Sequence, residues 1–272
     1  MIRVLSFQGK SIIVTGASSG LGAALAEAFA RHGAQLTLLA RREAALDEIA
    51  DRCRGLGGAA VSVVGDVTRA EDCKRVVDKA VDVYGGVDVL MANAGVSMWA
   101  KFEDIPDVGM FRELIEVNYL GVVNCVHAAL PHLRERQGAI VAVSSIQGKI
   151  PVPLHSGYVA SKHALQGFLD TIRGELRGTG VDVITALPHW LRGTELRQSA
   201  LSHDGERIGE GRREHSKESV SLEACSEAIV KGVERREREI VIPWKLRLLP
   251  WVKLVAPWFL DHLVRGAMDQ QD

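Results

Sequence analysis

The sequence predicts an α/β fold, a doubly wound parallel sheet in a single domain with a C-terminal hydrophobic helical extension. Short apolar runs alternate with segments of helical spacing along most of the chain, and this alternation is typical of βαβ units. The runs are apolar throughout, as strands buried on both faces are. The chain has 272 residues, enough for one such domain.

The expected strands follow one another at regular intervals. We expect them at residues 11–16, 35–40, 59–67, 87–95, 138–145 and 181–188. Helical patterns lie between them, beginning with residues 21–33 and 42–57. No linker precedes residue 190. The polar segment 197–220 is predicted to be a mobile loop or a pair of short helices.

Composition excludes several classes of protein. The net charge is −1, so no overall basic field attracts nucleic acid. The four cysteines form no C-x-x-C pair, which favours a reducing compartment, and we expect a cytoplasmic protein. The N-terminus lacks the pattern of a signal peptide. Because no run of 18 uncharged apolar residues occurs, we expect no membrane-spanning helix.

A glycine-rich turn, "TGASSGLG", follows the first expected strand at residues 15–22. Glycines let the backbone approach a pyrophosphate closely, and the next helix offers free N–H groups and its positive dipole end. A plain tight turn is the alternative, but the position after the first strand of a βαβ unit favours a dinucleotide site. The expected contacts are Gly16, Ser18, Ser19, Gly20, Leu21 and Gly22.

The end of the second strand indicates which dinucleotide binds. A site for NAD usually places an acid there, to bind the ribose 2′-hydroxyl. Here Ala40 is followed by Arg41 and Arg42, and arginine pairs with a 2′-phosphate. We therefore predict NADP(H). The alternative is that both arginines merely solvate the start of the second helix.

Tyr158 and Lys162 are four residues apart, which places them on one face of a helix. An ammonium beside a phenol favours the phenolate, so we expect the pKa of Tyr158 to be lowered. Ser145 ends an expected strand upstream. Because open α/β sheets bind ligands at the carboxyl ends of their strands, the three side chains are predicted to meet there.

With these motifs in order, the chain resembles the short-chain dehydrogenase/reductase family over roughly residues 9–195. "TGASSGLG" matches the family's TGxxxGxG, and "ANAG" (92–95) matches its NNAG with Ala92 in place of the first Asn. Asp66 and Val67 lie where the family contacts adenine. Ser145, Tyr158, Lys162 and Asn118 match the catalytic set.

The resemblance implies a Rossmann-like fold and hydride transfer between a nicotinamide and a carbonyl carbon. Tyr158 would exchange the proton, Ser145 would polarise the carbonyl, Lys162 would hold the ribose, and Asn118 would support a proton-relaying water. The remaining cofactor contacts that it implies, beyond the glycine turn and the arginines, are Asp66, Val67, Asn93, Ala94, Gly95, Tyr158, Lys162, Pro188 and Thr194.

The segment after the sixth strand departs from the family. Where the family reads Pro-Gly, this chain has Pro188-His189, and Thr194 is the candidate for the carboxamide contact. Trp99, His189 and Trp190 are candidates for the substrate site, where apolar walls favour a lipophilic carbonyl compound or alcohol. Core packing of both tryptophans and space filling by His189 are the alternatives. No histidine spacing indicates a metal, so we expect none.

The tail repeats Pro-Trp at residues 243, 250 and 257. Drawn as a helix, it places its tryptophans on one apolar stripe, and the prolines predict two or three short helices in a bent chain. Three interpretations stay open. The tryptophan face packs on the domain or on a second subunit, or residues 243–266 lie on a membrane surface, or the tail is a lid over the substrate.

These observations predict an NADPH-dependent reductase of a lipophilic ketone, with a catalytic domain at 1–242, a substrate loop at 189–220 and the extension at 243–272. We expect a homodimer or homotetramer. Two alternatives are a non-catalytic NADP(H) sensor or scaffold, and a reductase of small carbonyls whose tail packs subunits. A third, an epimerase or dehydratase, is disfavoured because the chain lacks a sizeable extra substrate domain.

Overall fold

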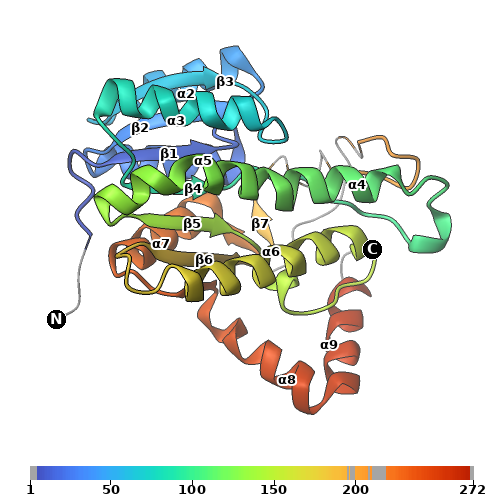
Figure 1. Cartoon of the computed structure of the whole chain (residues 1–272). Helices are drawn as coiled ribbons and strands as arrows, with labels where there is room; N and C mark the ends of the chain where they lie inside the picture. Colours follow the sequence, from blue (N-terminus) through green and yellow to red (C-terminus); the bar gives the residue numbers. More distant parts are fainter. Residues whose placement is uncertain (1–4, 195, 197–199, 208, 210–218, 270–272) are drawn as a thin grey trace.

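The computed structural model describes residues 5–194, 196, 200–207, 209 and 219–269. Its main element is a seven-stranded sheet, entirely parallel, in the order β3-β2-β1-β4-β5-β6-β9 (Figure 1). The strands are β1 (Ser11–Thr15), β2 (Gln35–Ala40), β3 (Ala59–Val64), β4 (Val89–Ala92), β5 (Ala139–Val143), β6 (Asp182–Pro188) and β9 (Glu239–Ile242). The predicted doubly wound parallel sheet is therefore confirmed.

Helices cover both faces of this sheet. One face packs against α1 (Gly20–Arg31), α2 (Glu43–Gly55) and α7 (Leu222–Glu234), and the other against α3 (Ala70–Tyr84), α5 (Gly121–Arg136) and α6 (Ser156–Glu175). Successive residues of each strand point to opposite faces. In β1, for example, Ile12 and Val14 join the first core and Ile13 joins the second. This two-sided burial is why the strands are apolar throughout.

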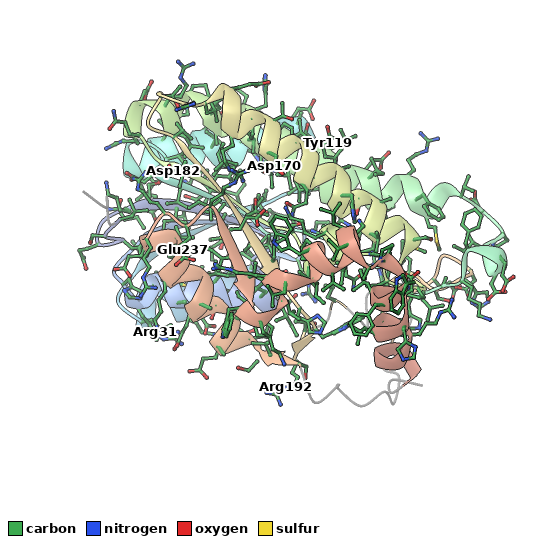
Figure 2. All side chains as sticks on the ribbon, turned by 90° about the horizontal axis from the view of Figure 1, so that it is seen from below. Arg31, Tyr119, Asp170, Asp182, Arg192 and Glu237 are labelled. Atoms are coloured by element: carbon green, nitrogen blue, oxygen red, sulfur yellow. The ribbon has the colours of Figure 1, made fainter. Side chains whose placement is uncertain are left out.

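The order of the strands in the sheet indicates where a ligand site lies. The chain runs outward from β1 to β3, then returns to β4 on the other side of β1. Ligands bind outside the carboxyl ends of strands at such a switch point. Charged side chains, among them Arg31, Asp182 and Arg192, lie toward the outside of the molecule (Figure 2).

The sequence analysis missed β9. The strand has only four residues, follows the charged run "ERRER" (234–238), and contains three consecutive apolar positions. It pairs with β6 in parallel, from Thr185 opposite Glu239 to Pro188 opposite Ile242. A short edge strand carries too little periodicity to be recognised without its partner.

Where it is described, the segment 197–220, predicted as a loop or short helices, is a loop with short β-pairings. β7 (Leu191–Arg192) pairs in parallel with β8 (Val220–Ser221), and Leu201 forms bridges with Met98 and Arg207. The rest of 197–220 lies largely outside the described residues. A short 3-10 helix, η1 (Phe102–Asp104), precedes α4 (Gly109–Ile115).

One described helical run, Gly109–Arg136, is long and apolar enough to span a bilayer by length and composition, with a mean hydropathy of 1.2. It comprises α4, the π-helix η2 (Glu116–Leu120) and α5. Its residues Cys125, Val126 and Ala129 belong to the core on the α3 face of the sheet. Because core helices of globular proteins pass the same test, the run is weak evidence for a span.

The tail forms three short helices, as its prolines predict. They are η4 (Trp244–Leu248), α8 (Leu249–Val255) and α9 (Pro257–Asp269), and each proline lies within one residue of a helix start. The sheet ends at Ile242, one residue before the first Pro-Trp pair. In Figure 1 α8 and α9 form a bent arm along one side of the domain.

Of the interpretations left open for the tail, packing of the tryptophan face on the domain is contradicted. Trp244, Trp251 and Trp258 are 75%, 66% and 74% exposed, so the tryptophan face does not pack on the domain. Leu246 and Leu260 are buried instead, against Ile146 and its neighbours. The prolines interrupt the helix twice. The stripe drawn on one continuous helix is therefore not the side that packs on the domain.

Candidate active site

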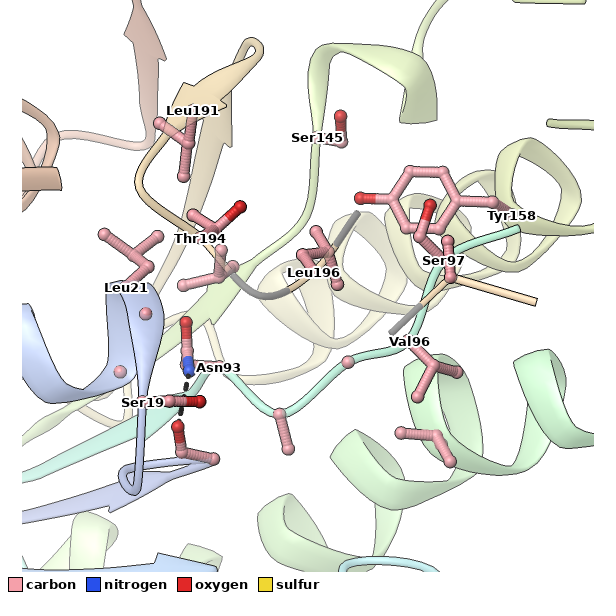
Figure 3. Close-up of a pocket in the computed structure, with 18 of the residues that line it drawn as sticks. Ser19, Leu21, Asn93, Val96, Ser97, Ser145, Tyr158, Leu191, Thr194 and Leu196 are labelled. Carbon is pink, nitrogen blue, oxygen red and sulfur yellow. Dashed lines mark hydrogen bonds between the residues drawn. The ribbon is translucent and has the colours of Figure 1, made fainter. Parts of the chain in front are cut away.

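A cavity of about 490 Å³ lies at the carboxyl ends of β1, β4, β5 and β6. Every residue proposed from the sequence for catalysis, cofactor or substrate lines it, except Asn118. Ser145 and Tyr158 lie at one end, Ser19, Leu21 and Asn93 lie at the other, and Thr194 lies between (Figure 3). The fold thus brings residues from 16 to 194 into one continuous site.

The glycine turn fits a phosphate cradle. Gly16 has a φ of +65°, and a Cβ there would lie 2.8 Å from the Ala94 Cα. A Cβ on Gly22 would collide with the Gly16 carbonyl oxygen. Asn93 secures the turn, because its Nδ2 donates to the Thr15 carbonyl at 3.0 Å. Glycine at these two positions lets the turn pack closely against residues 93–94 and against itself, which shapes the cradle beside the N-terminus of α1.

Basic side chains lie beside this turn. Arg42 Nη2 donates to Ser18 Oγ at 3.4 Å, and Arg41 Nη1 lies 3.7 Å from Asp66 Oδ2. Arg41 is largely exposed, so this ion pair is weak. Both guanidinium groups border the cavity where β2 ends. An anion at this end of the site would therefore meet two cations and a hydroxyl.

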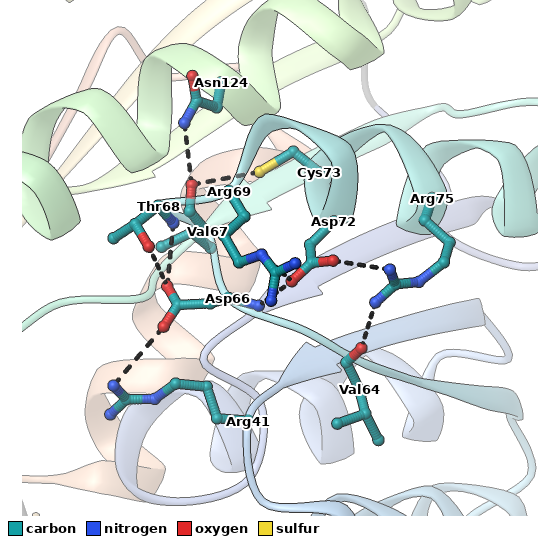
Figure 4. A network of polar contacts seen from close by, with 10 residues as sticks. All are labelled: Arg41, Val64, Asp66, Val67, Thr68, Arg69, Asp72, Cys73, Arg75 and Asn124. Atoms are coloured by element: carbon teal, nitrogen blue, oxygen red, sulfur yellow. Dashed lines mark hydrogen bonds and ion pairs between the residues drawn. The ribbon is translucent and has the colours of Figure 1, made fainter.

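A polar network fixes the neighbouring loop at Asp66 and Val67 (Figure 4). Buried Asp72 accepts hydrogen bonds from the Asp66 backbone N–H at 2.8 Å and from Arg75 at 2.7 Å. Its pKa is held below the usual range, chiefly by the Asp66 N–H. Asn124 donates to the Val67 carbonyl at 3.1 Å. The loop therefore presents a preorganised edge to the cavity.

Ser145, Tyr158 and Lys162 meet at the opposite end. Ser145 follows β5, and the other two lie one turn apart on α6. All three are buried, with Lys162 only 4% exposed. Lys162 Nζ lies 5.7 Å from the centre of the Tyr158 ring and donates to the Val143 carbonyl at 3.0 Å. Ser145 Oγ accepts from the Gln147 N–H at 3.2 Å.

Asn118 is fully buried behind the cavity wall, within the π-helix η2. Its Oδ1 accepts from the Val96 N–H and its Nδ2 donates to the Val96 carbonyl, both at 2.9 Å. Nδ2 also donates to Ser161 Oγ at 2.9 Å. The side chain thus ties the loop after β4 to α6. A role for Asn118 in a proton relay stays a prediction.

Comparison with known proteins settles the family. The model of the short chain dehydrogenase family matches residues 10–205. The chain belongs to the short-chain dehydrogenase family. It is therefore an oxidoreductase of alcohol and carbonyl groups with a nicotinamide cofactor.

Similar proteins are found among plant and archaeal enzymes. An "11-beta-hydroxysteroid dehydrogenase A" of Sesamum indicum is 36% identical over 262 residues, 94% of this chain and 75% of that protein. The "11-beta-hydroxysteroid dehydrogenase-like 4A" of Arabidopsis thaliana is 37% identical over 93% of this chain and 82% of its own. The alcohol dehydrogenase of Thermococcus sibiricus, solved with 5-hydroxy-NADP, superposes with a TM-score of 0.72 at 27% identity, covering 85% and 94% of the two chains.

Burial dominates the titration of the catalytic pair in this short-chain dehydrogenase. It raises the pKa of Tyr158 to about 12, an effect that a hydrogen bond with Ser145 partly offsets. The lowered pKa expected from the sequence is therefore not found, because burial outweighs the neighbouring cation. Burial also lowers the pKa of Lys162 to about 8. Tyr158 thus keeps its proton at neutral pH, as a general acid must.

The short-chain dehydrogenase has an aromatic wall next to Tyr158, which we define as Trp99, His155, His189 and Trp190. The Trp99 and His155 rings meet edge to face at 4.8 Å, and His155 and Trp190 do so at 5.4 Å. His189 and Trp190 lie 6.1 Å apart. All four residues line the cavity, so the tryptophans are not merely core packing.

His155 was missed by the sequence analysis, although it lies three residues before Tyr158. It is 2% exposed, and its Nδ1 lies 2.9 Å from the Pro153 carbonyl. A lone histidine before a helix carries no ligand spacing, and only the fold brings it to the tryptophans. Other lining residues that sequence reasoning missed are mostly small or apolar: Val96, Ser97, Met98, Ile146, Gln147, Leu191, Leu196, Ala200, Arg207 and Ser219.

Thr194 lies next to the glycine turn. A Cβ built on Gly20 would lie 3.9 Å from the Thr194 Cβ. His189 extends β6, since its N–H donates to the Ile242 carbonyl at 2.9 Å. The chain between them turns back over the cavity through β7. Contact between Thr194 and the carboxamide of the nicotinamide stays a prediction.

Proposed function

We propose that this short-chain dehydrogenase is an NADPH-dependent reductase of a lipophilic ketone, acting through Ser145, Tyr158 and Lys162. The observation that carries the proposal is the layout of the cavity. A glycine cradle with two arginines lies at one end, and a buried Ser-Tyr-Lys set with an aromatic wall lies at the other. This layout suits an extended dinucleotide bound across the carboxyl ends of the strands, with its phosphates at the cradle.

The residues present fit a nicotinamide nucleotide, because the glycine turn, the N-terminus of α1 and the two arginines line one end of the cavity and together offer N–H donors and positive charge to phosphates. When bound, the nucleotide supplies the hydride. Lys162, together with Thr194 and Pro188, would hold its nicotinamide half, and the loops at Asp66 and at residues 93–95 would hold the adenine half. The rest of the chemistry belongs to the protein.

Tyr158 and Ser145 act on the substrate oxygen. Ser145 Oγ donates a hydrogen bond that polarises the carbonyl, and Tyr158 gives its proton as negative charge develops on the oxygen. Because the Tyr158 pKa is about 12, the phenol is fully protonated at pH 7, which suits reduction. Lys162 places a cation beside the phenol and stabilises the phenolate that is left.

The substrate class is proposed from the wall and the relatives. Three aromatic groups at mutual distances of 4.8 to 6.0 Å form a rigid apolar surface beside Tyr158. Relatives named for 11-beta-hydroxysteroids are similar over nearly the whole chain. We therefore propose a flat, multi-ring ketone or the matching secondary alcohol, such as a steroid. A cytoplasmic homo-oligomer with its catalytic unit at 1–242 is part of the same proposal.

Removing the wall should narrow the substrate range. Trp190→Ala is expected to lower kcat/KM for multi-ring ketones by about ten- to a hundredfold, while a small ketone changes far less, because only the large substrate uses the lost apolar surface. Steady-state rates with a series of ketones measure this. Phe102→Ala is the matched control, since Phe102 is 68% exposed and outside the cavity. Equal losses for small and large ketones would argue against the proposed wall.

The choice of NADPH should depend on the arginines. Arg41→Ala with Arg42→Ala is expected to weaken NADPH binding by about a hundredfold and to leave NADH binding nearly unchanged, because each arginine would pair with the 2′-phosphate. Calorimetric titration of both nucleotides measures the two affinities. Arg52→Ala is the matched control on the same side of the domain, as Arg52 does not line the cavity. Equal weakening of NADH and NADPH would contradict a 2′-phosphate site.

A further inference from the structure

The tail carries an exposed apolar surface that neither the cavity nor the core uses. We define the tail face as Trp244, Leu248, Trp251, Leu254, Val255, Trp258, Phe259 and Leu263, all exposed. It contains three of the five tryptophans of the chain. Eight exposed apolar residues gathered within one segment of twenty residues are typical of an interaction site.

The tail face is held in a fixed orientation. On the opposite side of the same helices, Leu246 and Leu260 are buried against Ile146, Ile150, Leu187 and Val241. Lys253 Nζ donates to the Lys149 carbonyl at 3.1 Å, which adds a polar tie to the domain. The tail is therefore docked through one side, and its tryptophans point away from the domain.

The composition of the tail matches a lipid surface. Residues 243–266 contain four basic side chains against the single acid Asp261. Lys253 and Arg247 contact the domain, so the charges that we assign to the lipid surface are those of the exposed Lys245 and Arg265. Tryptophans settle at the boundary between headgroups and acyl chains, and basic residues beside them attract anionic headgroups. Short helices that lie along a membrane surface place their tryptophans and their basic residues at the same depth.

We propose that the tail face docks this protein on an anionic membrane surface, without spanning it. A contact between two copies fits less well, because interface cores are poor in lysine and would place these like charges together. A lid is disfavoured, since no described residue of the tail lines the cavity. The vesicle binding inferred here does not depend on the proposed enzymatic function.

The docked side of the tail, opposite the tail face, lies close to the substrate end of the cavity. Ile146 packs against Leu246 and Leu260 and also lines the cavity, directly after Ser145. Docking would therefore bring the Ser145 end of the site near the lipid boundary. This consequence rests on the proposed function: a lipophilic ketone dissolved in the bilayer would then reach the site without crossing water.

Flotation of the full-length protein with vesicles tests the docking surface. Binding to vesicles of phosphatidylcholine and phosphatidylglycerol in equal amounts is expected, with weaker binding to phosphatidylcholine alone and at high salt. The joint substitution Trp244→Ser, Trp251→Ser and Trp258→Ser should lower partitioning by about tenfold or more. Because these side chains are exposed, the variant should keep the thermal stability of the parent.

Two further variants sharpen the test. Lys245→Glu with Arg265→Glu should lower binding to the anionic vesicles alone. Phe102→Ser, which removes an equally exposed ring elsewhere, should bind as the parent does. The proposal is overturned if no vesicle is bound or if the triple tryptophan variant binds equally well. It is also overturned if that variant turns a dimer into a monomer while vesicles stay unbound, because the face would then join two copies.

NADPH oxidation with a water-soluble ketone, measured on the same samples, separates the two proposals. Turnover without vesicle binding overturns the docking surface only, and vesicle binding without turnover overturns the enzymatic function only.

Discussion

Tyr158→Phe is expected to lower the rate of NADPH-dependent ketone reduction by about a hundred- to ten-thousandfold, because the variant lacks the proton that the product oxygen takes. The affinity for NADPH should change little, since the ring and its packing beside Lys162 are kept. Stopped-flow rates and a fluorescence titration of NADPH measure the two effects separately.

Tyr84→Phe is the matched control. Tyr84 ends α3 and lies outside the cavity, and its hydroxyl contacts only a backbone carbonyl at 3.4 Å. Full activity is expected there. If Tyr158→Phe kept its turnover, Tyr158 would not be the acid, and a water or another group would have to deliver the proton.

Lys162→Met is expected to change how stability depends on pH. The unfolded chain holds the Lys162 proton up to about pH 10.5, whereas the folded protein holds it only to about pH 8. Between these values the unfolded state binds more protons, so this lysine makes the protein more stable as pH rises. The lowered pKa corresponds to about 3 kcal/mol in the free energy of unfolding.

The difference in unfolding free energy between parent and Lys162→Met isolates this contribution. Between pH 8 and 10 this difference is expected to shift in favour of the parent by most of those ~3 kcal/mol. The reason is that the cost of burying the charged Lys162 is fully present below pH 8 and fades above it. Urea unfolding at several pH values measures it. Lys74→Met, at an exposed lysine, should give a difference that stays constant with pH. A constant difference for Lys162→Met as well would show that burial does not depress its pKa.

The fold was predictable because its signals are local and repeated. Six strands lie as apolar runs between helical patterns, and the glycine turn at residues 15–22 adopts the close approach that only glycine permits. β9 was not predictable from the same signals, because its four residues are recognised as a strand only through their pairing with β6. Strand pairing across some fifty residues leaves no periodic trace in the sequence.

The site was predictable where one motif contributes several residues, and less so where tertiary packing decides. Ser145, Tyr158 and Lys162 were found from spacing and family resemblance, but the pKa of Tyr158 moves opposite to the expectation because burial could not be read from the sequence. His155 joins the aromatic wall only through the turn before α6. The tail helices follow from the prolines, whereas the side that docks depends on Leu246 and Leu260 meeting Ile146.

The most direct test of the proposed enzyme is the consumption of NADPH and of NADH by the full-length protein with ketones of rising hydrophobicity, from short-chain to steroidal. We expect kcat/KM to rise along the series and to be higher with NADPH throughout. Oxidation of neither nucleotide by any ketone, with NADPH nevertheless bound tightly, would contradict a reductase and favour a nucleotide-binding sensor or scaffold.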